Sequence, residues 1–452
     1  MSKVIFVSSR LFSAFILGLL LSACASYGVV ENKQVSEVSL GKDVYSVEAF
    51  NHRLSGKKTA IILAFSGGGT RAAALSYGVL SELNETFADP SNPNKPLLDD
   101  VAIISAVSGG SFTAAYYGLH GKDIFNQFET RFLKKNVERA LVKNVLNPIH
   151  WFGRKGRTEY AIEYYDKEIF DGATYRDMLR PDRPMVLINA TGLSRGVRFS
   201  FMQEYFNLLC SDLTDFSISR AVAASSAVPL LFNPVVVKNY AGCLDDNPQW
   251  LTAARDRAKE DPELDLLVEG LESFFDKESH QYAHFVDGGI TDNLGLRSIF
   301  DITKLLGGAK TTNEIFNIDA PERLIVISVD ASARPDYDIA NSPNPPGFFE
   351  TVNAMTDIQL HRYNTATLSG IQSATKGWAE ELSDESQKVE AQFIRLSFDD
   401  VDDSDLKKHL NRIPTSLSLE SNQVDLLIDT GRKLLRNNPS FLKAFEGIRV
   451  NY

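Results

Sequence analysis

The sequence contains no run of more than two consecutive lysines or arginines, and its 58 acidic residues outnumber its 47 basic ones. The formal net charge is −11 at pH 7. A chain without a basic patch has little attraction for a polyanion, which argues against nucleic-acid binding and against electrostatic docking on anionic headgroups. We therefore expect no nucleic-acid partner.

The chain also lacks a long apolar segment of the kind that crosses a membrane, which needs roughly 20 residues. An uncharged run from Leu11 to Leu21 follows Lys3 and Arg10 near the start of the chain. Its length and its basic flank are typical of a secretory signal rather than of a spanning helix. We expect a signal peptide over residues 1–23.

The four residues that end this segment, Leu-Ser-Ala-Cys, resemble the lipobox of bacterial lipoproteins. The resemblance implies that Cys24 is lipid-modified and anchors the chain in a bacterial cell envelope; an ordinary cleavage site with an incidental cysteine is the alternative. Ala25 stands where lipoproteins of the inner membrane often carry aspartate, which favours the outer membrane. The polar residues 24–57 are expected to form a tether between membrane and body.

Only two cysteines remain beyond this point, Cys210 and Cys243. In an oxidising envelope they could form a disulfide, and in their apolar surroundings they could equally be buried free thiols. The sequence leaves both readings open.

Apolar runs of strand length alternate with helical patterns, and this alternation predicts an α/β fold whose mostly parallel central sheet is flanked by helices. Two segments, Phe125–Asp171 and Asp245–Ser279, do not fit that pattern and are interpreted as helical insertions. We expect a main domain over 58–335 and a C-terminal α/β extension over 336–452 that packs on the core. The predicted strands are 59–65, 101–107, 184–190, 283–289, 323–331 and 392–398.

A glycine cluster, Gly67-Gly68-Gly69, follows the first of these strands and precedes a helix. Glycines leave their N–H groups unshielded at the positive end of the helix, where an anion or an oxyanion can bind. The phosphate-binding pattern G-x-x-x-x-G-K-[ST] is absent, but Gly67, Gly69 and Ala72 do satisfy a dinucleotide pattern. A dinucleotide fold would end the next strand with an acid, whereas this chain has Ser-Gly-Gly-Ser there, which favours an oxyanion.

That second turn contains Ser108 in the frame A-x-S-x-G, close to the G-x-S-x-G of nucleophilic serines, with Ala106 in place of the first glycine. A serine needs a base, and neither His284 nor His361 lies in a stretch that looks like a catalytic loop. Asp287, before Gly288 and Gly289 at a strand end, is the alternative base. It could instead form an Asx-turn, but Asp292 and Asn293 lie better to cap the next helix.

Four motifs together resemble the patatin-like phospholipases, which use a Ser-Asp dyad without histidine. They are Ser66 to Arg71 (the oxyanion loop and its basic residue), Ala106 to Ser111 (the nucleophile turn), Ala221 to Val235 (helix, turn and proline) and Val286 to Asn293 (the aspartate motif). The resemblance covers about Thr59 to Ala331. Ser66 and Ala106 depart from the residues most members have there.

The resemblance implies a patatin-like fold and an anchored hydrolase of lipid acyl esters, of the phospholipase or lysophospholipase type. Ser108 would be the nucleophile and Asp287 the base, and the amides of Gly67, Gly68 and Gly69, with Arg71 nearby, would hold the oxyanion. A Ser-His-Asp esterase using His361 or His409 and a non-catalytic lipid-binding lipoprotein are the alternatives.

No cofactor or metal is expected, since the acidic run Asp399–Asp405 lacks the central glycine and distant glutamate of a calcium loop. The oligomeric state is not specified by the sequence.

Overall fold

The structure is a computed structural model that describes residues 28–38, 40–88, 91–145, 155–243, 248–334, 339, 343–445 and 449–450. The expected signal peptide and the proposed lipidation site Cys24 lie outside these residues. No helix in the described part of the chain is both long and apolar enough to cross a membrane.

Eight of the described strands form one sheet in the order β11-β10-β2-β4-β5-β9-β8, with β6 also paired to β5. The first five strands of this order are parallel, as expected from their apolar runs. Their bounds are β11 Glu390–Ser397, β10 Arg323–Asp330, β2 Thr59–Phe65, β4 Val101–Val107 and β5 Met185–Gly192.

The other three strands are β9 Tyr282–Asp287, β8 Val235–Lys238 and β6 Val197–Ser200. The apolar run 283–289 predicts a further strand of the parallel sheet, and this prediction is wrong because β9 runs antiparallel to β5. An apolar run specifies burial of a strand but carries no information about its direction. The chain therefore enters β9 beyond the carboxyl end of β5 and runs back along it to Asp287, opposite to the expected direction.

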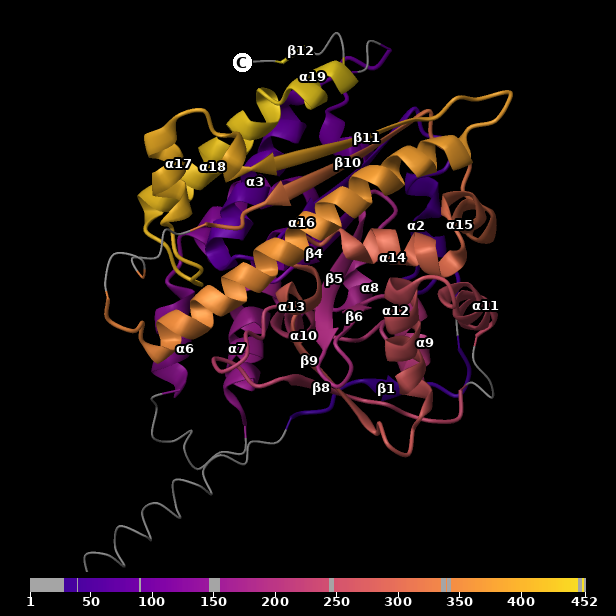
Figure 1. Cartoon of the computed structure of the whole chain (residues 1–452), viewed down its shortest axis with the longest axis horizontal. Coiled ribbons are helices and arrows are strands. Elements are labelled where there is room, and N and C mark those ends of the chain that lie inside the picture. Colours follow the sequence, from indigo (N-terminus) through magenta and orange to yellow (C-terminus); the bar gives the residue numbers. More distant parts are fainter. Residues whose placement is uncertain are drawn as a thin grey trace, which may run out of the picture.

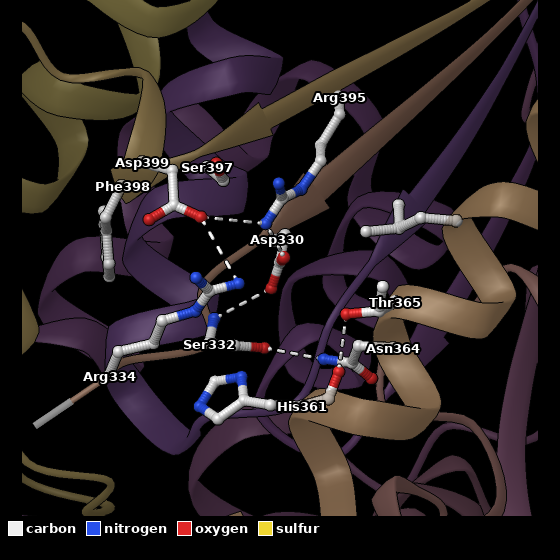
Figure 2. A pocket seen from close by; sticks show the side chains of 11 residues that line it. Asp330, Ser332, Arg334, His361, Asn364, Thr365, Arg395, Ser397, Phe398 and Asp399 are labelled. Carbon is white, nitrogen blue, oxygen red and sulfur yellow. Dashed lines mark hydrogen bonds and ion pairs between the residues drawn. The ribbon is translucent and has the colours of Figure 1, made fainter. Parts of the chain in front are cut away.

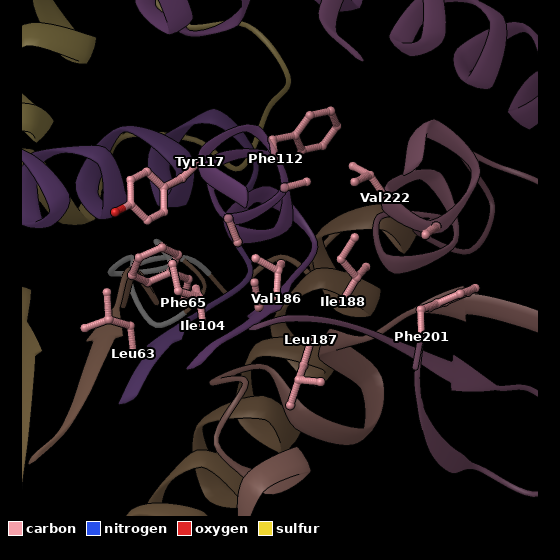
Figure 3. Packing of buried hydrophobic residues seen from close by; sticks show 14 of the residues in the cluster. Leu63, Phe65, Ile104, Phe112, Tyr117, Val186, Leu187, Ile188, Phe201 and Val222 are labelled. Carbon is pink, nitrogen blue, oxygen red and sulfur yellow. The ribbon is translucent and has the colours of Figure 1, made fainter. Parts of the chain in front are cut away.

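Alternate residues of β2 face two different cores, as the pleat of a strand requires. Ile61, Leu63 and Phe65 join a large cluster with helices α3 Gly69–Glu85, α4 Gly109–His120 and α18 Ser421–Arg436. The residues between them join a second cluster with α14 Arg297–Leu306 and α16 Phe348–Leu382. Figure 1 shows α16 crossing in front of the sheet and α3 behind it, and Figure 3 shows the packing of the larger cluster.

The first expected insertion is helical and packs on the core. It contains α5 Ile124–Phe128, α6 Val137–Val145 and α7 Arg157–Tyr165. Phe132 stacks on Phe112 of α4 with ring centroids 4.4 Å apart, and both rings are fully buried. An aromatic side chain of this segment thus covers α4, the helix that follows Ser108.

The second insertion contains α11 Gln249–Ala258 and α12 Pro262–Glu272. The remaining short helices are α2 Val47–Phe50, α8 Tyr175–Met178, α9 Gln203–Leu208, α10 Ile218–Ser225, α13 Gly289–Asp292, α15 Ala309–Phe316, α17 Ser404–Asn411 and α19 Pro439–Ala444. Two small antiparallel pairs join β1 Lys33–Gln34 to β7 Ser211–Asp212 and β3 Thr86–Phe87 to β12 Arg449–Val450.

The N-terminal residues from 28 onward do not behave as the free tether that was expected. The buried guanidinium of Arg220 forms ion pairs of 2.8 Å with Glu31 and with Glu159. It also donates to the carbonyl of Val29, and β1 pairs with β7 a few residues later. These buried contacts fix the described N-terminal residues to the body.

Cys210 and Cys243, for which the sequence left two readings open, are joined by a disulfide.

Candidate active site

Ser108 occupies a sharp turn between the end of β4 and the start of α4. Its backbone has φ 50° and ψ −121°, a conformation that is costly for any residue with a side chain and that often marks a functional position. Ala106 lies within β4 and is not among the described residues with positive φ, so its methyl group causes no backbone strain. The serine turn therefore forms without the first glycine of the usual pattern.

The glycines after Ser108 are required by close packing against the glycine loop. A Cβ on Gly109 would lie 2.0 Å from the carbonyl oxygen of Gly69, and one on Gly110 would lie 2.7 Å from that of Ser66. A Cβ on Gly67 would be 3.4 Å from the Cβ of Ser108. The two glycine-rich turns, about 40 residues apart in the sequence, thus touch one another at the carboxyl edge of the sheet, as expected.

Asp287 reaches Ser108 because β5 extends beyond the end of β4. Asn189 of β5 pairs with Val107, the last residue of β4, and the next residue, Ala190, pairs with Asp287. The Ser108 hydroxyl donates a hydrogen bond of 2.8 Å to Oδ2 of Asp287. The structure therefore brings together the two residues that the sequence predicted as nucleophile and base.

The other carboxylate oxygen of Asp287 has a structural role. Oδ1 accepts the Gly289 amide at 2.7 Å, as in an Asx-turn. The Asx-turn and the catalytic role are alternatives in the sequence, but the structure combines them on the two carboxylate oxygens of Asp287. Asp292 accepts the amide of Arg297, the first residue of α14, at 2.7 Å, although Leu296 is the N-cap residue of that helix. Asn293, also expected as a cap, instead donates to the Ser332 hydroxyl at 3.0 Å.

Asp287 is only 8% exposed, and this burial makes its carboxyl group a weaker acid. Loss of solvation raises the pKa of its carboxyl to about 6, and the bonds from Gly289 and Ser108 oppose this shift only in part. A carboxylate with this pKa is ionised at neutral pH and is a stronger base than an exposed aspartate.

Ser225, at the end of α10, links the two catalytic candidates. Its hydroxyl oxygen accepts the Ser108 amide at 2.8 Å, and its carbonyl accepts the Gly288 amide at 3.0 Å. The neighbouring carbonyl of Ala227 accepts the Asp287 amide at 3.0 Å. The sequence pointed to the segment Ala221–Val235 only by resemblance, and no local signal identified Ser225, because its partners are distant in the sequence.

The glycine loop offers fewer free donors than expected. The Gly67 amide already donates to the Asn293 carbonyl at 2.8 Å. The amides of Gly68 and Gly69 have no acceptor within the described residues, and neither has that of Gly109, which was not among the expected oxyanion donors. These three N–H groups belong to the starts of α3 and α4, where the helix dipoles favour negative charge.

Arg71 binds the C-terminal part of the chain rather than pointing at Ser108. Its buried guanidinium donates to the carbonyls of Ala331 at 2.9 Å and Ile413 at 2.6 Å, and to the hydroxyl of Thr415 at 3.0 Å. Burial lowers its pKa to about 10, so it stays charged at neutral pH. Its positive charge lies beneath the glycine loop, near Gly68.

His361, the histidine of the alternative triad, lies in α16 beside a small polar cavity at the ends of β10 and β11 (Figure 2). Its Nε2 is 3.1 Å from the Ala333 carbonyl oxygen, and none of the described histidines forms a hydrogen bond with Ser108. The cavity has a volume of about 10 Å³, which is room for one water and not for a lipid.

In the described part of the chain, no group of three or more histidine, cysteine, aspartate or glutamate side chains is arranged to hold a metal ion. The acidic run after β11 forms caps instead. Asp400 accepts the amide and the hydroxyl of Ser397, and Asp403 accepts two amides at the start of α17.

Among solved structures, the chain resembles human GIVD cytosolic phospholipase A2, with 12% identity, a TM-score of 0.43 and coverage of 92% of this chain and 68% of that one. The same human enzyme in complex with methyl gamma-linolenyl fluorophosphonate gives 12% identity, a TM-score of 0.42 and coverage of 93% and 70%. VipD from Legionella pneumophila gives 12% identity, a TM-score of 0.35 and coverage of 93% and 72%.

Comparison with curated protein sequences finds no match. The sequence model of the family described as patatin-like phospholipase, however, matches residues 63–300, a range that contains Ser108, Asp287 and the glycine loop. Because this match spans more than half of the 452 residues, the chain belongs to the patatin-like phospholipase family and is a serine acyl-ester hydrolase.

Proposed function

We propose that this chain hydrolyses acyl esters of membrane lipids, of the phospholipid or lysophospholipid type, with Ser108 as nucleophile and Asp287 as its only general base. The observation that carries the proposal is the 2.8 Å hydrogen bond from the Ser108 hydroxyl to the buried Asp287 carboxylate. The strained turn under Ser108 and the raised pKa of Asp287 support it.

In the proposed reaction, Oδ2 of Asp287 accepts the Ser108 proton while Oγ attacks the ester carbonyl carbon. The amides of Gly68, Gly69 and Gly109 donate to the oxyanion that develops, at the positive ends of two helices. The carboxyl group of Asp287 then returns the proton to the leaving alcohol. A water molecule, deprotonated by the same carboxylate, hydrolyses the acyl-enzyme and frees the acid.

The proposal includes attachment to a membrane through Cys24, in a bacterial envelope and by resemblance in its outer membrane. The acidic net charge and the lack of any run of more than two consecutive lysines or arginines argue against electrostatic attachment. A covalent lipid at Cys24 would therefore supply most of the attachment.

Labelling with a lipid-like fluorophosphonate tests the nucleophile directly. We expect one adduct, mapped by mass spectrometry to Ser108, and no adduct in Ser108→Ala. A labelled residue other than Ser108 would reject the assignment, and absence of labelling together with absence of turnover would favour the non-catalytic lipid-binding alternative. His361→Ala separates the dyad from the Ser-His-Asp alternative, because only the latter predicts its inactivation.

A further inference from the structure

Four consecutive residues, Val228-Pro229-Leu230-Leu231, lie exposed directly after the segment that holds Ser108 and Asp287 in place. The residues Leu230 and Leu231 are 69% and 62% exposed. Ile290, next to the Gly288-Gly289 turn, is 53% exposed. A run of this kind is unusual on a soluble surface and marks a binding surface more often than a defect. We refer to Val228–Leu231 and Ile290 as the apolar rim.

The rim is held outward by ordered structure at both of its ends. Before it, the Ala227 carbonyl accepts the Asp287 amide. Within it, the Val228 carbonyl accepts the amides of Leu231 and Phe232, and Phe232 packs against the core. After it, the Asn233 carbonyl accepts the Thr158 hydroxyl at 2.6 Å. The loop is therefore a fixed turn, and the exposure of its leucines is built into the fold.

Leu230 adopts φ 72°, one of the few positive φ values at non-glycine residues in the described chain. This backbone conformation is an outlier for a residue with a bulky side chain, and it costs conformational free energy. A leucine that is both strained and exposed gains nothing from folding alone. The cost is recovered if the side chain enters an apolar phase.

The start of the described chain lies on the same part of the molecule as the rim. A Cβ on Gly28 would be 2.3 Å from Cγ2 of Val236, so Gly28 packs directly on β8, which begins four residues after Leu231. Cys24 precedes Gly28 by four residues, which span at most about 14 Å. A lipid on Cys24 would hold this face within about that distance of the bilayer.

We propose that the apolar rim inserts into the interface of the lipid bilayer and that the short N-terminal strap turns the Ser108–Asp287 site toward the membrane that anchors the chain. This inference rests on the proposed lipid hydrolase activity and names the surface from which its substrate enters. The driving force is burial of apolar side chains, because the chain is acidic overall and its sequence contains no run of more than two consecutive lysines or arginines.

Depth-dependent fluorescence quenching tests the insertion without any reference to activity. The full-length protein carrying Leu231→Trp is mixed with phosphatidylcholine vesicles whose lipids are brominated near the top of the acyl chains. The matched control is Leu442→Trp, because Leu442 is 46% exposed. It belongs to α19, which lies at the top of Figure 1, whereas β8, the strand that follows the rim, lies near the bottom. The three native tryptophans are common to both proteins and cancel in the comparison.

We expect the added emission of Leu231→Trp to fall by about half on brominated vesicles and that of Leu442→Trp to stay unchanged. Equal quenching of both, or of neither, would overturn the proposal. A blue shift of Leu231→Trp that needs no vesicles and grows with protein concentration would also overturn it, because the rim would then bind a second copy of the chain.

A kinetic comparison adds a readout that depends on the proposed activity. The double variant Leu230→Glu/Leu231→Glu is compared with the control Leu442→Glu. The ratio of turnover on phospholipid vesicles to turnover on a soluble short-chain ester should be at least about tenfold lower in the double variant than in the control. An equal loss on both substrates would overturn the docking role. If the parent protein hydrolyses neither substrate, the proposed function fails, while the quenching result still decides whether the rim enters the bilayer.

Discussion

Asp287 uses its two carboxylate oxygens for two tasks, and this division is the central feature of the site at the scale of single residues. Oδ1 closes the turn to Gly289, and Oδ2 receives the Ser108 hydroxyl. The turn fixes the carboxylate in space, so that little orientation is lost when the proton moves. Burial then sets the basicity of the oxygen that faces Ser108.

The pH dependence of kcat/KM should report the Asp287 carboxyl. Its pKa of about 6 lies above the ordinary value, and only the ionised form accepts the serine proton, so activity should fall about tenfold per pH unit below that value. The measurement is a profile on a soluble ester between about pH 4.5 and 8.

Burial also raises the pKa of Asp292 to about 6, so this residue needs a control. Asp292→Asn keeps an oxygen for the Arg297 amide, so the fall of kcat/KM at low pH, the acid limb of the profile, should remain. Loss of the limb in this variant would assign it to Asp292.

Ser225→Ala should loosen the nucleophile turn. The change removes the acceptor of the Ser108 amide and leaves a buried donor unpaired, at a cost of about 1–3 kcal/mol in the free energy of unfolding. We expect turnover to fall about tenfold as Ser108 loses its orientation. Ser226→Ala is the matched control, because its hydroxyl bonds back to the Val222 carbonyl and interacts with Tyr165, and it has no hydrogen bond to Ser108 or Asp287. Similar kinetics for both variants would argue against a specific role for Ser225.

At the scale of helices and strands, the C-terminal extension supports the oxyanion loop. The Ser416 carbonyl accepts the Thr70 amide at 2.8 Å, and a Cβ on Gly69 would lie 2.4 Å from the same oxygen. Arg71 binds Ile413 and Thr415 in the same stretch. Behind them, α18 packs closely along α3, the helix that begins with the loop. Residues more than 300 positions later in the chain thus shape the loop.

Gly78→Ala should disturb this support from a distance. A Cβ on Gly78 of α3 would lie 2.2 Å from the backbone oxygen of Ile428 in α18, so the two helices would have to separate. We expect a loss of about 2–3 kcal/mol in the free energy of unfolding, measured with urea. Gly370→Ala on α16 is the control, since a Cβ there meets open space and should stabilise the helix by about 0.5–1 kcal/mol. Equal effects of the two changes would refute the close contact.

The sequence predicts well those features that depend on residues close together in the chain. The bounds of β2 and β4 agree with the apolar runs, and the turns after them contain the glycines and Ser108 where expected. The direction of β9 could not be predicted, because burial does not depend on it. Nor could the occupied amide of Gly67 or the partner of Arg71 be predicted, since both depend on carbonyls far away in the sequence.

At the scale of the whole molecule, the described N-terminal residues are part of the body rather than a spacer. Arg220 ties Glu31 to Glu159 and belongs to α10, the helix that ends at Ser225. The sequence misassigned residues 28–57 to a tether because their polar composition and weak periodicity resemble those of a linker. The partners that fix Val29 lie more than 120 residues away, and those that fix Arg53, namely Asp99 and Val101, lie 46 and 48 residues away.

Cys24→Ser should detach the protein from membranes. The variant keeps the apolar rim, but a few side chains give only weak and reversible binding compared with a covalent lipid, and the acidic body adds none. Fractionation of cells should place most of the variant in the soluble fraction, or trap it as an unprocessed precursor. Membrane attachment equal to that of the parent chain would contradict the anchor.

The turnover of Asp287→Asn on a phospholipid substrate tests the central claim most directly. Asparagine keeps the oxygen that accepts the Gly289 amide, so folding should be little affected, but its amide cannot take the Ser108 proton. Turnover should fall by about three to four orders of magnitude, Ser108→Ala should reach a similar floor, and the double variant should be scarcely worse than either. Activity above about one tenth of the parent in Asp287→Asn, with Ser108→Ala inactive, would contradict the dyad.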